Sequence, residues 1–471
     1  MARVTRIAII GGGPGGYEAA LVGAQLGAEV TVVDSDGIGG SAVLTDCVPS
    51  KTIVATAEVM IDTAESGELG VRLGAAGADA SQEGGIGVDL GRLNQRVLAL
   101  AKAQSDDIAA RLEREGVRIL RGTGRLDGPT RVAATTAGGE ETVEADAVLV
   151  ATGAHPRVLP DAQPDGERIL TWEQVYSLAE LPERLVVVGS GVTGAEFASA
   201  YTALGSDVTL VSSRDRVLPG EDADAASVLE DVFRRRGMTV LSRARAGAVK
   251  RTDSGVEVAL EDGRTVEGSH CLMAVGSIPN TAGIGLEEAG VRLSPGGFVD
   301  VDRVSRTSAS TVYAAGDCTG VLMLASVAAM QGRIAMWHAL GDAVTPLRLR
   351  SASSNVFTDP EIATVGWTQR DVDEGGTDAV VVKLPLATNA RAKMQGVHDG
   401  FVKLFCRPGS GTVVGGVVVA PRASELIYPV AVAVDVRLTA DQLAHSFTIY
   451  PSISGSIAEA ARQLHTRFDA D

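Results

Sequence analysis

A strand, a glycine-rich loop and a helix follow one another at the start of this chain of 471 residues, and their order constrains the fold more than any other feature. The apolar run 4–10 predicts a buried strand, and the pattern over 17–26 predicts a helix. Between them, Gly11, Gly13 and Gly16 have the spacing G-x-G-x-x-G. Such glycines let the backbone approach a pyrophosphate at the N-terminus of the helix. The segment therefore predicts a dinucleotide-binding unit.

An acidic residue follows where such a unit needs one. The run 28–33 predicts a second strand, and Asp34 ends it. A carboxylate about 20 residues after the glycines accepts hydrogen bonds from the ribose of a dinucleotide. We therefore expect Asp34 to bind ribose. The run 142–150 predicts a further strand.

The same order recurs in the middle of the chain. The run 185–188 predicts a strand, and a helix is predicted through Leu204. Between them, Gly189, Gly191 and Gly194 repeat the glycine spacing. A duplicated unit implies two nucleotides, which in an oxidoreductase are FAD and NAD(P)H.

The second unit has no acid at its ribose position. Its second strand, 208–211, is followed by Ser212, Ser213, Arg214 and Arg216. A carboxylate would repel a 2′-phosphate, whereas serine and arginine side chains can accept it. We therefore expect NADPH to be used and NADH to be tolerated. The alternative is that these arginines are ordinary solvated turn residues.

The composition predicts several α/β domains and argues against some partners. The chain has 56 glycines and 45% hydrophobic residues, which is typical of globular α/β proteins with many tight turns. Its net charge of −17 argues against nucleic acid as a partner. The four cysteines form no C-x-x-C pair, so we predict no metal site. No apolar run approaches the roughly 20 residues that span a bilayer. We expect a cytoplasmic protein without a transmembrane segment.

The segment 37–51 resembles the redox segment of the flavoprotein disulfide reductase family, to which glutathione reductase and dihydrolipoamide dehydrogenase belong. In that family two cysteines form a redox-active disulfide beside the flavin. Here the second stands as Cys47, but the position of the first holds Ala42. A disulfide needs two sulfurs, so this site cannot perform dithiol–disulfide exchange. Two readings of Cys47 stay open, a small buried side chain without chemistry and a modest role beside the flavin.

Other matches to the family imply further roles. The resemblance places Lys51 near N5 of the flavin and pairs it with Glu196. It also implies that Asp317 holds the ribityl chain of FAD. Val192 stands where several relatives carry a tyrosine that covers the nicotinamide pocket, so that pocket would be more open here.

The chain from about residue 348 resembles the interface domain of the family. That domain builds a homodimer in which each active site borrows proton-transfer residues from the partner. Tyr450 stands in place of the family's histidine, and Gly455 in place of the glutamate that orients it. A phenol with a pKa of about 10 transfers protons poorly near neutral pH. His445 lies too early in the chain to be a good replacement.

The expected fold class is α/β, with two Rossmann-like dinucleotide-binding domains, for FAD and NAD(P), and a C-terminal α+β dimerisation domain. The FAD-binding domain would comprise 1–152 and 277–347. The NAD(P)-binding domain would comprise 153–276, and the dimerisation domain 348–471.

The residues expected to take part in catalysis are Cys47, Lys51, Glu196 and Tyr450. The residues expected to bind FAD or NAD(P) are Gly11, Gly13, Pro14, Gly15, Gly16, Asp34, Ser35, Gly39, Gly40, Ser41, Lys51, Gly124, Ala151, Thr152, Gly153, Gly189, Gly191, Val192, Thr193, Gly194, Glu196, Ser212, Ser213, Arg214, Gly276, Gly316, Asp317, Ala325 and Ser326.

The pattern of losses predicts a changed electron acceptor. The thiol expected at position 42, the base expected at 450 and its partner at 455 are missing, while both nucleotide units are kept. NAD(P)H would reduce FAD, which would pass electrons directly to a quinone-like acceptor. The chain resembles a non-disulfide branch of the family, whose members are NAD(P)H:quinone reductases with a dihydrolipoamide-dehydrogenase-like sequence. Two alternatives stay open. One is a pyridine nucleotide transhydrogenase or diaphorase, and the other is a non-catalytic flavin-binding redox sensor or dehydrogenase-complex subunit.

Overall fold

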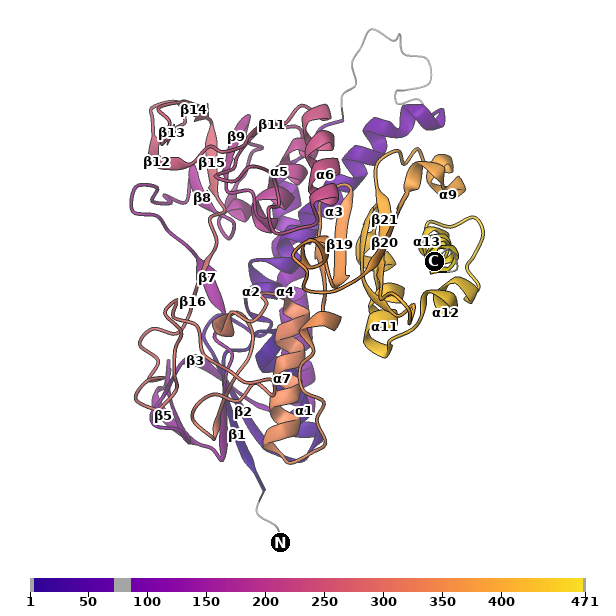
Figure 1. Cartoon of the computed structure of the whole chain (residues 1–471). Helices are drawn as coiled ribbons and strands as arrows, with labels where there is room; N and C mark the ends of the chain where they lie inside the picture. The colour runs from indigo at the N-terminus through magenta and orange to yellow at the C-terminus, as the bar shows by residue number, and fades with distance from the viewer. Residues whose placement is uncertain (1–3, 72–85, 469–471) are drawn as a thin grey trace. The chain divides into compact units, whose positions relative to one another are not determined.

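The computed structural model describes residues 4–71 and 86–468, and Figure 1 shows the course of the chain. Its contacts group the chain into two compact units. Unit 1 comprises 1–50, 94–157 and 276–348, and unit 2 comprises 51–93, 158–275 and 349–471. Helices α3 (Cys47–Glu65) and α4 (Leu90–Arg114) each contain residues of both units.

Unit 1 is built on a seven-stranded sheet in the order β17-β6-β1-β2-β3-β4-β5. The bounds of these strands are β1 (Arg6–Ile10), β2 (Glu29–Asp34), β3 (Arg118–Leu126), β4 (Arg131–Thr136), β5 (Gly139–Glu144), β6 (Ala147–Val150) and β17 (Val312–Ala314). The pairs from β17 to β3 are parallel, and β3, β4 and β5 pair antiparallel. The predicted strands at the start of the chain are thereby confirmed as β1 and β2.

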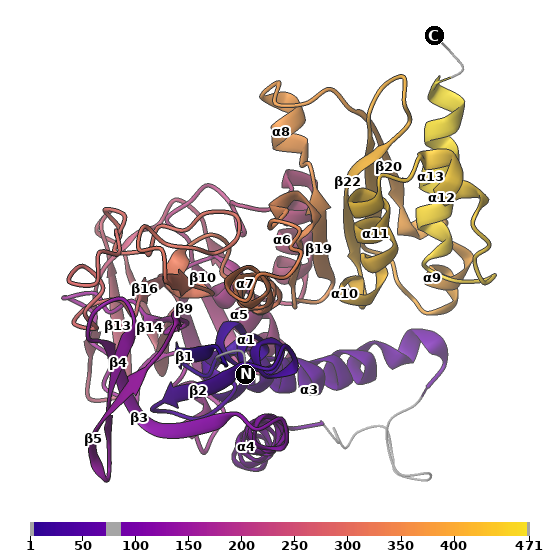
Figure 2. The same cartoon turned by 90° about the horizontal axis from the view of Figure 1, so that it is seen from below.

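Two helices pack together in unit 1. They are α1 (Pro14–Gln25) and α7 (Ala325–Ala339), which lie side by side in both views (Figure 1, Figure 2). Their backbones touch, because a Cβ on Gly332 would lie 2.0 Å from the carbonyl oxygen of Gly15. The unit also contains α2 (Gly40–Leu44), the short turn η3 (Asp317–Thr319) and the antiparallel pair β7 (Ala154–Pro156) and β16 (Ser277–Pro279).

The single strand predicted over 142–150 is wrong. The structure has two strands there, β5 pairing with β4 and β6 pairing with β1. The break falls at Ala145 and Asp146, where the Asp146 carboxylate accepts a hydrogen bond of 2.8 Å from the backbone N–H of Arg6. Hydropathy alone did not show this break, because both strands bury apolar side chains.

Unit 2 contains a five-stranded parallel sheet in the order β11-β10-β9-β15-β8. The bounds are β8 (Ile169–Thr171), β9 (Arg184–Val188), β10 (Asp207–Val211), β11 (Thr239–Leu241) and β15 (His270–Met273). Helices α5 (Val192–Leu204) and α6 (Ala223–Arg235) follow β9 and β10 along the chain, and β12 (Ala246–Arg251), β13 (Val256–Leu260) and β14 (Thr265–Gly268) form a small antiparallel sheet. The predicted second strand–loop–helix segment is confirmed.

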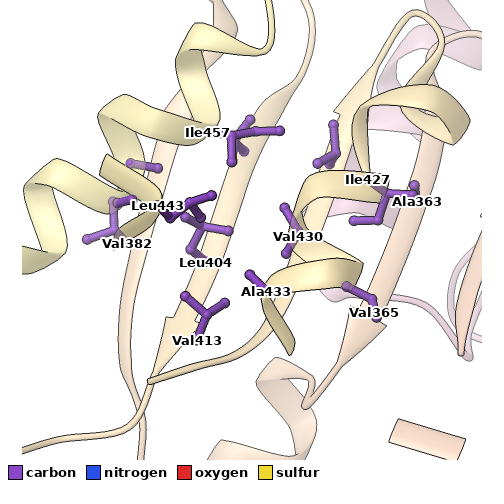
Figure 3. Close-up of a cluster of buried hydrophobic side chains, with 14 of the residues drawn as sticks. Ala363, Val365, Val382, Leu404, Val413, Ile427, Val430, Ala433, Leu443 and Ile457 are labelled. Atoms are coloured by element: carbon purple, nitrogen blue, oxygen red, sulfur yellow. The ribbon is translucent and has the colours of Figure 1, made fainter. Parts of the chain in front are cut away.

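The C-terminal part of unit 2 is an antiparallel sheet with helices against one face. The sheet has the order β18-β19-β22-β21-β20, with bounds β18 (Ser353–Val356), β19 (Glu361–Gly366), β20 (Val380–Pro385), β21 (Phe401–Cys406) and β22 (Val413–Ala420). The helices are α10 (Ala423–Leu426), α11 (Tyr428–Val436), α12 (Ala440–His445) and α13 (Gly455–Phe468). Figure 3 shows the buried core between them, where Leu404 and Val413 of the sheet face Val430 and Leu443 of the helices.

The other short elements are η1 (Ser66–Leu69), η2 (Val175–Ser177), η4 (Leu349–Ser351), α8 (Gln369–Asp373), η5 (Leu386–Thr388) and α9 (Ala390–Met394). Within the residues that the structure describes, no helix has the length and apolar character needed to cross a bilayer.

Candidate active site

The residues expected to bind FAD gather at one edge of the sheet of unit 1. Strands β17, β6, β1 and β2 are parallel neighbours, so their carboxyl ends lie together. The segments that follow these strands begin at Ala315, Ala151, Gly11 and Ser35. In an open parallel sheet, ligands bind at this edge.

The loop after β1 requires glycine for two close backbone approaches. Gly11 has a φ of 102°, and a Cβ there would lie 2.3 Å from the carbonyl oxygen of Ala151. A Cβ on Gly16 would lie 1.9 Å from the carbonyl oxygen of Gly11. Gly13 caps α1 with an extended backbone and has no side chain to bond the first-turn N–H groups. Pro14 has no N–H, and the N–H of Gly16 donates to the carbonyl oxygen of Gly13 over 2.8 Å. The N–H of Gly15 has no acceptor among the described residues and can bind a pyrophosphate, so the loop fits FAD.

The loop after β9 in unit 2 repeats this geometry. A Cβ on Gly189 would lie 2.1 Å from the carbonyl oxygen of Ala274, and one on Gly194 would lie 1.8 Å from the oxygen of Gly189. Gly191 caps α5, and no described atom lies within 4 Å of the place of a Cβ there. Val192, the next residue, is 42% exposed. The loop after β9 therefore also leaves open space at the N-terminus of a helix, and it fits a second dinucleotide.

The segment that precedes Ala42, the position of the missing cysteine, lies against the glycine loop after β1. The backbone N–H of Gly39 donates to the carbonyl oxygen of Gly12 over 2.8 Å. Gly40 has a φ of 57°, and a Cβ there would lie 2.7 Å from the Cα of Gly13. Ser41 follows in α2 with an exposed side chain. Glycine at 39 and 40 thus brings α2 to the expected position of the pyrophosphate.

Asp34 is held in one orientation by the backbone. Its Oδ2 accepts from the N–H of Gly12 at 2.6 Å, and its Oδ1 accepts from the N–H groups of Gly37 at 2.6 Å and Asp36 at 3.0 Å. Oδ1 already accepts two hydrogen bonds, whereas Oδ2 accepts one and keeps a further lone pair. The side chain can therefore accept a ribose hydroxyl through Oδ2 while it holds the glycine loop.

Asp317 begins η3 after β17, with Gly316 as its cap. Burial and the carboxylate of Asp46 raise the pKa of Asp317 to about 6. The N–H of Gly316 donates to Oε1 of the buried Gln331 over 2.9 Å. No cation among the described residues lowers this pKa. An enclosed carboxylate is costly unless it is hydrogen-bonded, and hydroxyl donors such as those of a ribityl chain would satisfy it.

Thr152 and Gly153 follow β6 at the same edge. The amide of Asn280 donates to the carbonyl oxygen of Thr152 and its N–H donates to that of Gly153, both over 2.9 Å. Gly124 lies in β3 beside Ile10, and the carbonyl oxygen of Gly276 accepts a backbone hydrogen bond from Arg157. Pro14 and Gly15 begin α1. Ala325 and Ser326 begin α7.

The pairing expected between Lys51 and Glu196 is present in unit 2. Nζ of Lys51 lies 2.7 Å from Oε2 of Glu196, whose side chain is 4% exposed. Oε1 of the same carboxylate accepts from the backbone N–H of Phe357 over 2.8 Å. The ring of Phe357 lies 4.9 Å from Nζ of Lys51, as a cation–π contact. The ammonium is therefore held on two sides.

Phe357 is the site residue that the sequence did not reveal. It follows β18 and lies far from Lys51 and Glu196 along the chain. The sequence-based match to the family covered this segment, but it gave no reason to connect the backbone N–H of one residue with Glu196. The connection depends on the fold.

The residues expected near the adenosine ribose follow β10. Ser212 is fully buried, and its Oγ lies 2.7 Å from Oγ of Ser190 and accepts from the N–H of Arg214 over 3.1 Å. Ser213 and Arg214 are exposed, and Arg216 is half-buried. The Ser212 hydroxyl thus bonds inside the loop, while the next residues face outward. Thr193 lies in the first turn of α5.

Cys47 and Tyr450 have different surroundings. Cys47 is the first residue of α3, one helical turn before Lys51, so the two share a helix face. None of the four cysteines, all of which the structure describes, forms a disulfide. Tyr450 is 86% exposed on the single chain. His445 instead bonds through Nδ1 to the carbonyl oxygen of Asp441 over 2.7 Å. No group of three or more metal-binding side chains is found within 4–71 and 86–468.

Comparisons with known proteins agree with this geometry. The family model described as pyridine nucleotide-disulphide oxidoreductase matches residues 5–332, and the model of its dimerisation domain matches residues 352–461. The chain is 56% identical to a Mycobacterium tuberculosis protein named NAD(P)H dehydrogenase (quinone), over 99% of this chain and 95% of the relative. It is 32% identical to dihydrolipoyl dehydrogenase 2 of Haloarcula marismortui, over 98% of both chains.

A solved structure gives the same result. The crystal structure of LpdA from Mycobacterium tuberculosis superposes with a TM-score of 0.92 at 56% identity, covering 98% of this chain and 100% of that one. Since one family model matches more than half of the residues, and the relatives match almost the whole chain, this chain belongs to the pyridine nucleotide-disulphide oxidoreductase family.

Proposed function

We propose that this chain is an FAD-dependent NAD(P)H dehydrogenase that passes electrons to a quinone without a redox-active disulfide. One observation carries the proposal. The two glycine loops make the close backbone approaches that favour dinucleotide binding, while Ala42 stands where a redox disulfide needs its first cysteine. The Mycobacterium tuberculosis relative named NAD(P)H dehydrogenase (quinone) supports the same activity for this chain.

The chain's own residues bind and orient the reactants. FAD, when bound, supplies the chemistry of accepting a hydride from NAD(P)H and giving electrons to a quinone. The loop from Gly11 to Gly16 and Asp34 would hold its ADP half, and Asp317 its ribityl chain. The loop from Gly189 to Gly194 would hold the pyrophosphate of NAD(P)H. Val192, with a small side chain, would leave room for the nicotinamide or a quinone ring.

Lys51 supplies a fixed positive charge. Its ammonium is held by Glu196 and by the ring of Phe357, so it needs no reorganisation when negative charge develops beside it. Family members carry the matching lysine near N5 of the flavin, and we assign Lys51 that place. Cys47 lies one turn earlier on the same helix, where a small thiol leaves the acceptor room.

Three finer assignments belong to this proposal. NADPH is the preferred donor, because Ser212 replaces the acid that would repel a 2′-phosphate. The chain forms a homodimer through its dimerisation domain, which the matching family model supports. Tyr450 of one subunit then donates a hydrogen bond to the quinone bound by the other.

Steady-state kinetics with matched acceptors test the proposal. The FAD-loaded protein is given NADPH or NADH, with menadione, oxidised lipoamide or a second pyridine nucleotide as acceptor. We expect menadione turnover at least a hundredfold faster than turnover of either alternative. Faster transfer to the second pyridine nucleotide would identify a transhydrogenase. Slow turnover with every acceptor would identify a flavin-binding sensor or subunit.

A further inference from the structure

We propose that Arg243, in the loop after the strand that neighbours the expected ribose position, acts with Arg214 as a two-armed clamp for the 2′-phosphate of NADPH. This inference rests on the proposed function, because it assigns a specificity-determining residue to the donor site. Arg214 was expected from the sequence, whereas nothing in the sequence pattern pointed to Arg243.

The topology brings the two residues together. Strands β10 and β11 are parallel neighbours, and their registers align Val211 with Leu241. Arg214 follows the first of these strands and Arg243 follows the second, so both lie at the same edge of the sheet. This is the edge at which a dinucleotide binds in an open parallel sheet.

Three backbone hydrogen bonds fix the contact between the two loops. The N–H of Ser212 donates to the carbonyl oxygen of Leu241 over 2.8 Å, and the N–H of Ala244 donates back to the oxygen of Ser212 over 2.7 Å. The N–H of Arg243 donates to the carbonyl oxygen of Arg214 over 2.7 Å. The Cα atoms of the two arginines are therefore close neighbours across a fixed bridge.

The loop after β11 has a strained conformation at this point. Arg243 has a φ of 55°, which is uncommon for a residue with a Cβ and costs about 1–2 kcal/mol. Glycine would adopt the same backbone without that cost. An arginine in this conformation therefore favours a role for its side chain. Non-glycine residues with a positive φ cluster at sites that hold ligands.

The charges at this edge suit a phosphate. Arg214 and Arg243 are both exposed, and neither forms an ion pair with any residue that the structure describes. The half-buried Arg216 has an enclosed Nε that finds no acceptor within the described part of the chain. Asp215 is the one carboxylate among residues 212–216. Guanidinium groups bind phosphate oxygens with paired, charge-assisted hydrogen bonds, and two of them can grip one phosphate from two sides.

A matched control is available in the same loop. Arg245 lies two residues after Arg243 and is exposed, but its Nε lies 3.8 Å from the carboxylate of Glu261. Removing its charge changes the local charge by the same amount as removing that of Arg243. It leaves the proposed clamp in place.

Binding of two nucleotide fragments tests the clamp without any turnover. The dissociation constants of adenosine 2′,5′-bisphosphate and of 5′-AMP are measured by calorimetry on the FAD-loaded protein and on R243Q, R214Q and R245Q. We expect R243Q and R214Q each to weaken binding of the bisphosphate about tenfold and to leave 5′-AMP within twofold. R245Q should change neither. An R243Q variant that binds the bisphosphate as tightly as the parent, or that loses both fragments equally, would overturn the proposal.

NADH-driven menadione turnover in the same variants separates this inference from the proposed function. In one outcome the parent protein reduces menadione, and R243Q reduces it at the parent rate with NADH but with a KM for NADPH that is about tenfold higher. The proposed function and the clamp are then both supported. If the parent fails to reduce menadione but the fragments still discriminate, the proposed function fails and the clamp stands. If the parent binds 5′-AMP as tightly as the bisphosphate, the clamp fails and the quinone activity is untouched.

Discussion

The ammonium of Lys51 lies 2.7 Å from Oε2 of Glu196, although 145 positions separate the two residues in the chain. The other oxygen of that carboxylate accepts from the backbone N–H of Phe357, so one buried side chain joins helix α3, helix α5 and the segment after β18. Hydrogen bonds to a charged group are stronger than those between neutral groups. Glu196 therefore fixes the position of Lys51 and the path of the backbone at Phe357 together.

Replacing Glu196 with glutamine should disturb both partners. A glutamine has one acceptor oxygen and one amide NH2 group, which only donates, so it cannot accept from Lys51 and from the Phe357 N–H with separate oxygens. We expect the variant E196Q to lose about 1–3 kcal/mol of stability and to reduce its flavin with NADPH at least tenfold more slowly. Thermal unfolding and stopped-flow flavin reduction measure the two effects. E58Q, at an exposed position of α3, is the control, and equal rates in parent and E196Q would refute a role for the pair.

Asp317 should make the protein without FAD less stable as the pH rises from about 4 to about 6. Its pKa is raised from 3.8 to about 6 in the folded chain, so the native state binds more protons than the unfolded state in this window. Stability falls wherever the native state binds more protons, and the loss is complete above pH 6. A difference of about two pKa units corresponds to at most ~3 kcal/mol.

The variant D317N tests whether Asp317 causes this loss of stability with rising pH. We expect its FAD-free form to be more stable than the parent at pH 7 by about 1–3 kcal/mol and equal to it at pH 4. It should nevertheless bind FAD more weakly, because the ribityl hydroxyls lose a charged acceptor. Unfolding midpoints across this pH range and FAD titration give both numbers. A parent and variant with parallel pH profiles would rule out the proposed origin of the pH dependence.

The buried Lys403 should contribute strongly to the stability of unit 2. Its Nζ lies 2.8 Å from Oδ2 of Asp222 and 2.7 Å from Oδ2 of Asp224, and its side chain is 3% exposed. Removing one partner of a buried ion pair leaves an uncompensated charge and costs about 3–5 kcal/mol. We expect this loss in K403M, measured by urea unfolding. Lys383 also pairs with Asp224 but is 43% exposed, so K383M should change stability by less than about 1 kcal/mol; equal losses in the two variants would be inconsistent with the burial argument.

Tyr450 gives a prediction about the dimer. The residue is 86% exposed on one chain, so its side chain can reach a partner subunit. If it donates a hydrogen bond to a quinone held by the partner, Y450F should lower kcat/KM for menadione about tenfold, a loss of about 1.4 kcal/mol. Flavin reduction by NADPH should be unchanged. An unchanged menadione rate would remove Tyr450 from the site.

Much of the nucleotide chemistry could be predicted from the sequence, because it depends on local patterns. The glycines at 11, 16, 189 and 194 mark close backbone approaches that leave no room for a side chain, and the structure contains both loops. The ion pair of Lys51 with Glu196 was predicted through the family resemblance. The domain boundaries and the roles of the site residues remain predictions.

The rest depends on tertiary geometry. The break at Asp146 was missed because it lies where the backbone N–H and the carboxylate of Asp146 both bond to the backbone of Arg6, which is distant in the sequence. Phe357 was missed because its contribution to Glu196 is a backbone N–H, which any residue but proline carries. Arg243 was missed because the order of β10 and β11 in the sheet brings it to Arg214.

Anaerobic stopped-flow mixing tests whether electrons leave the flavin for a quinone without a protein disulfide. The FAD-loaded protein is first reduced with one equivalent of NADPH per subunit and then mixed with menadione or with oxidised lipoamide. We expect one equivalent to bleach the flavin, menadione to restore its absorbance within the time of one turnover, and lipoamide to leave it reduced. A flavin that NADPH does not reduce, or that lipoamide reoxidises as fast as menadione, would contradict this expectation.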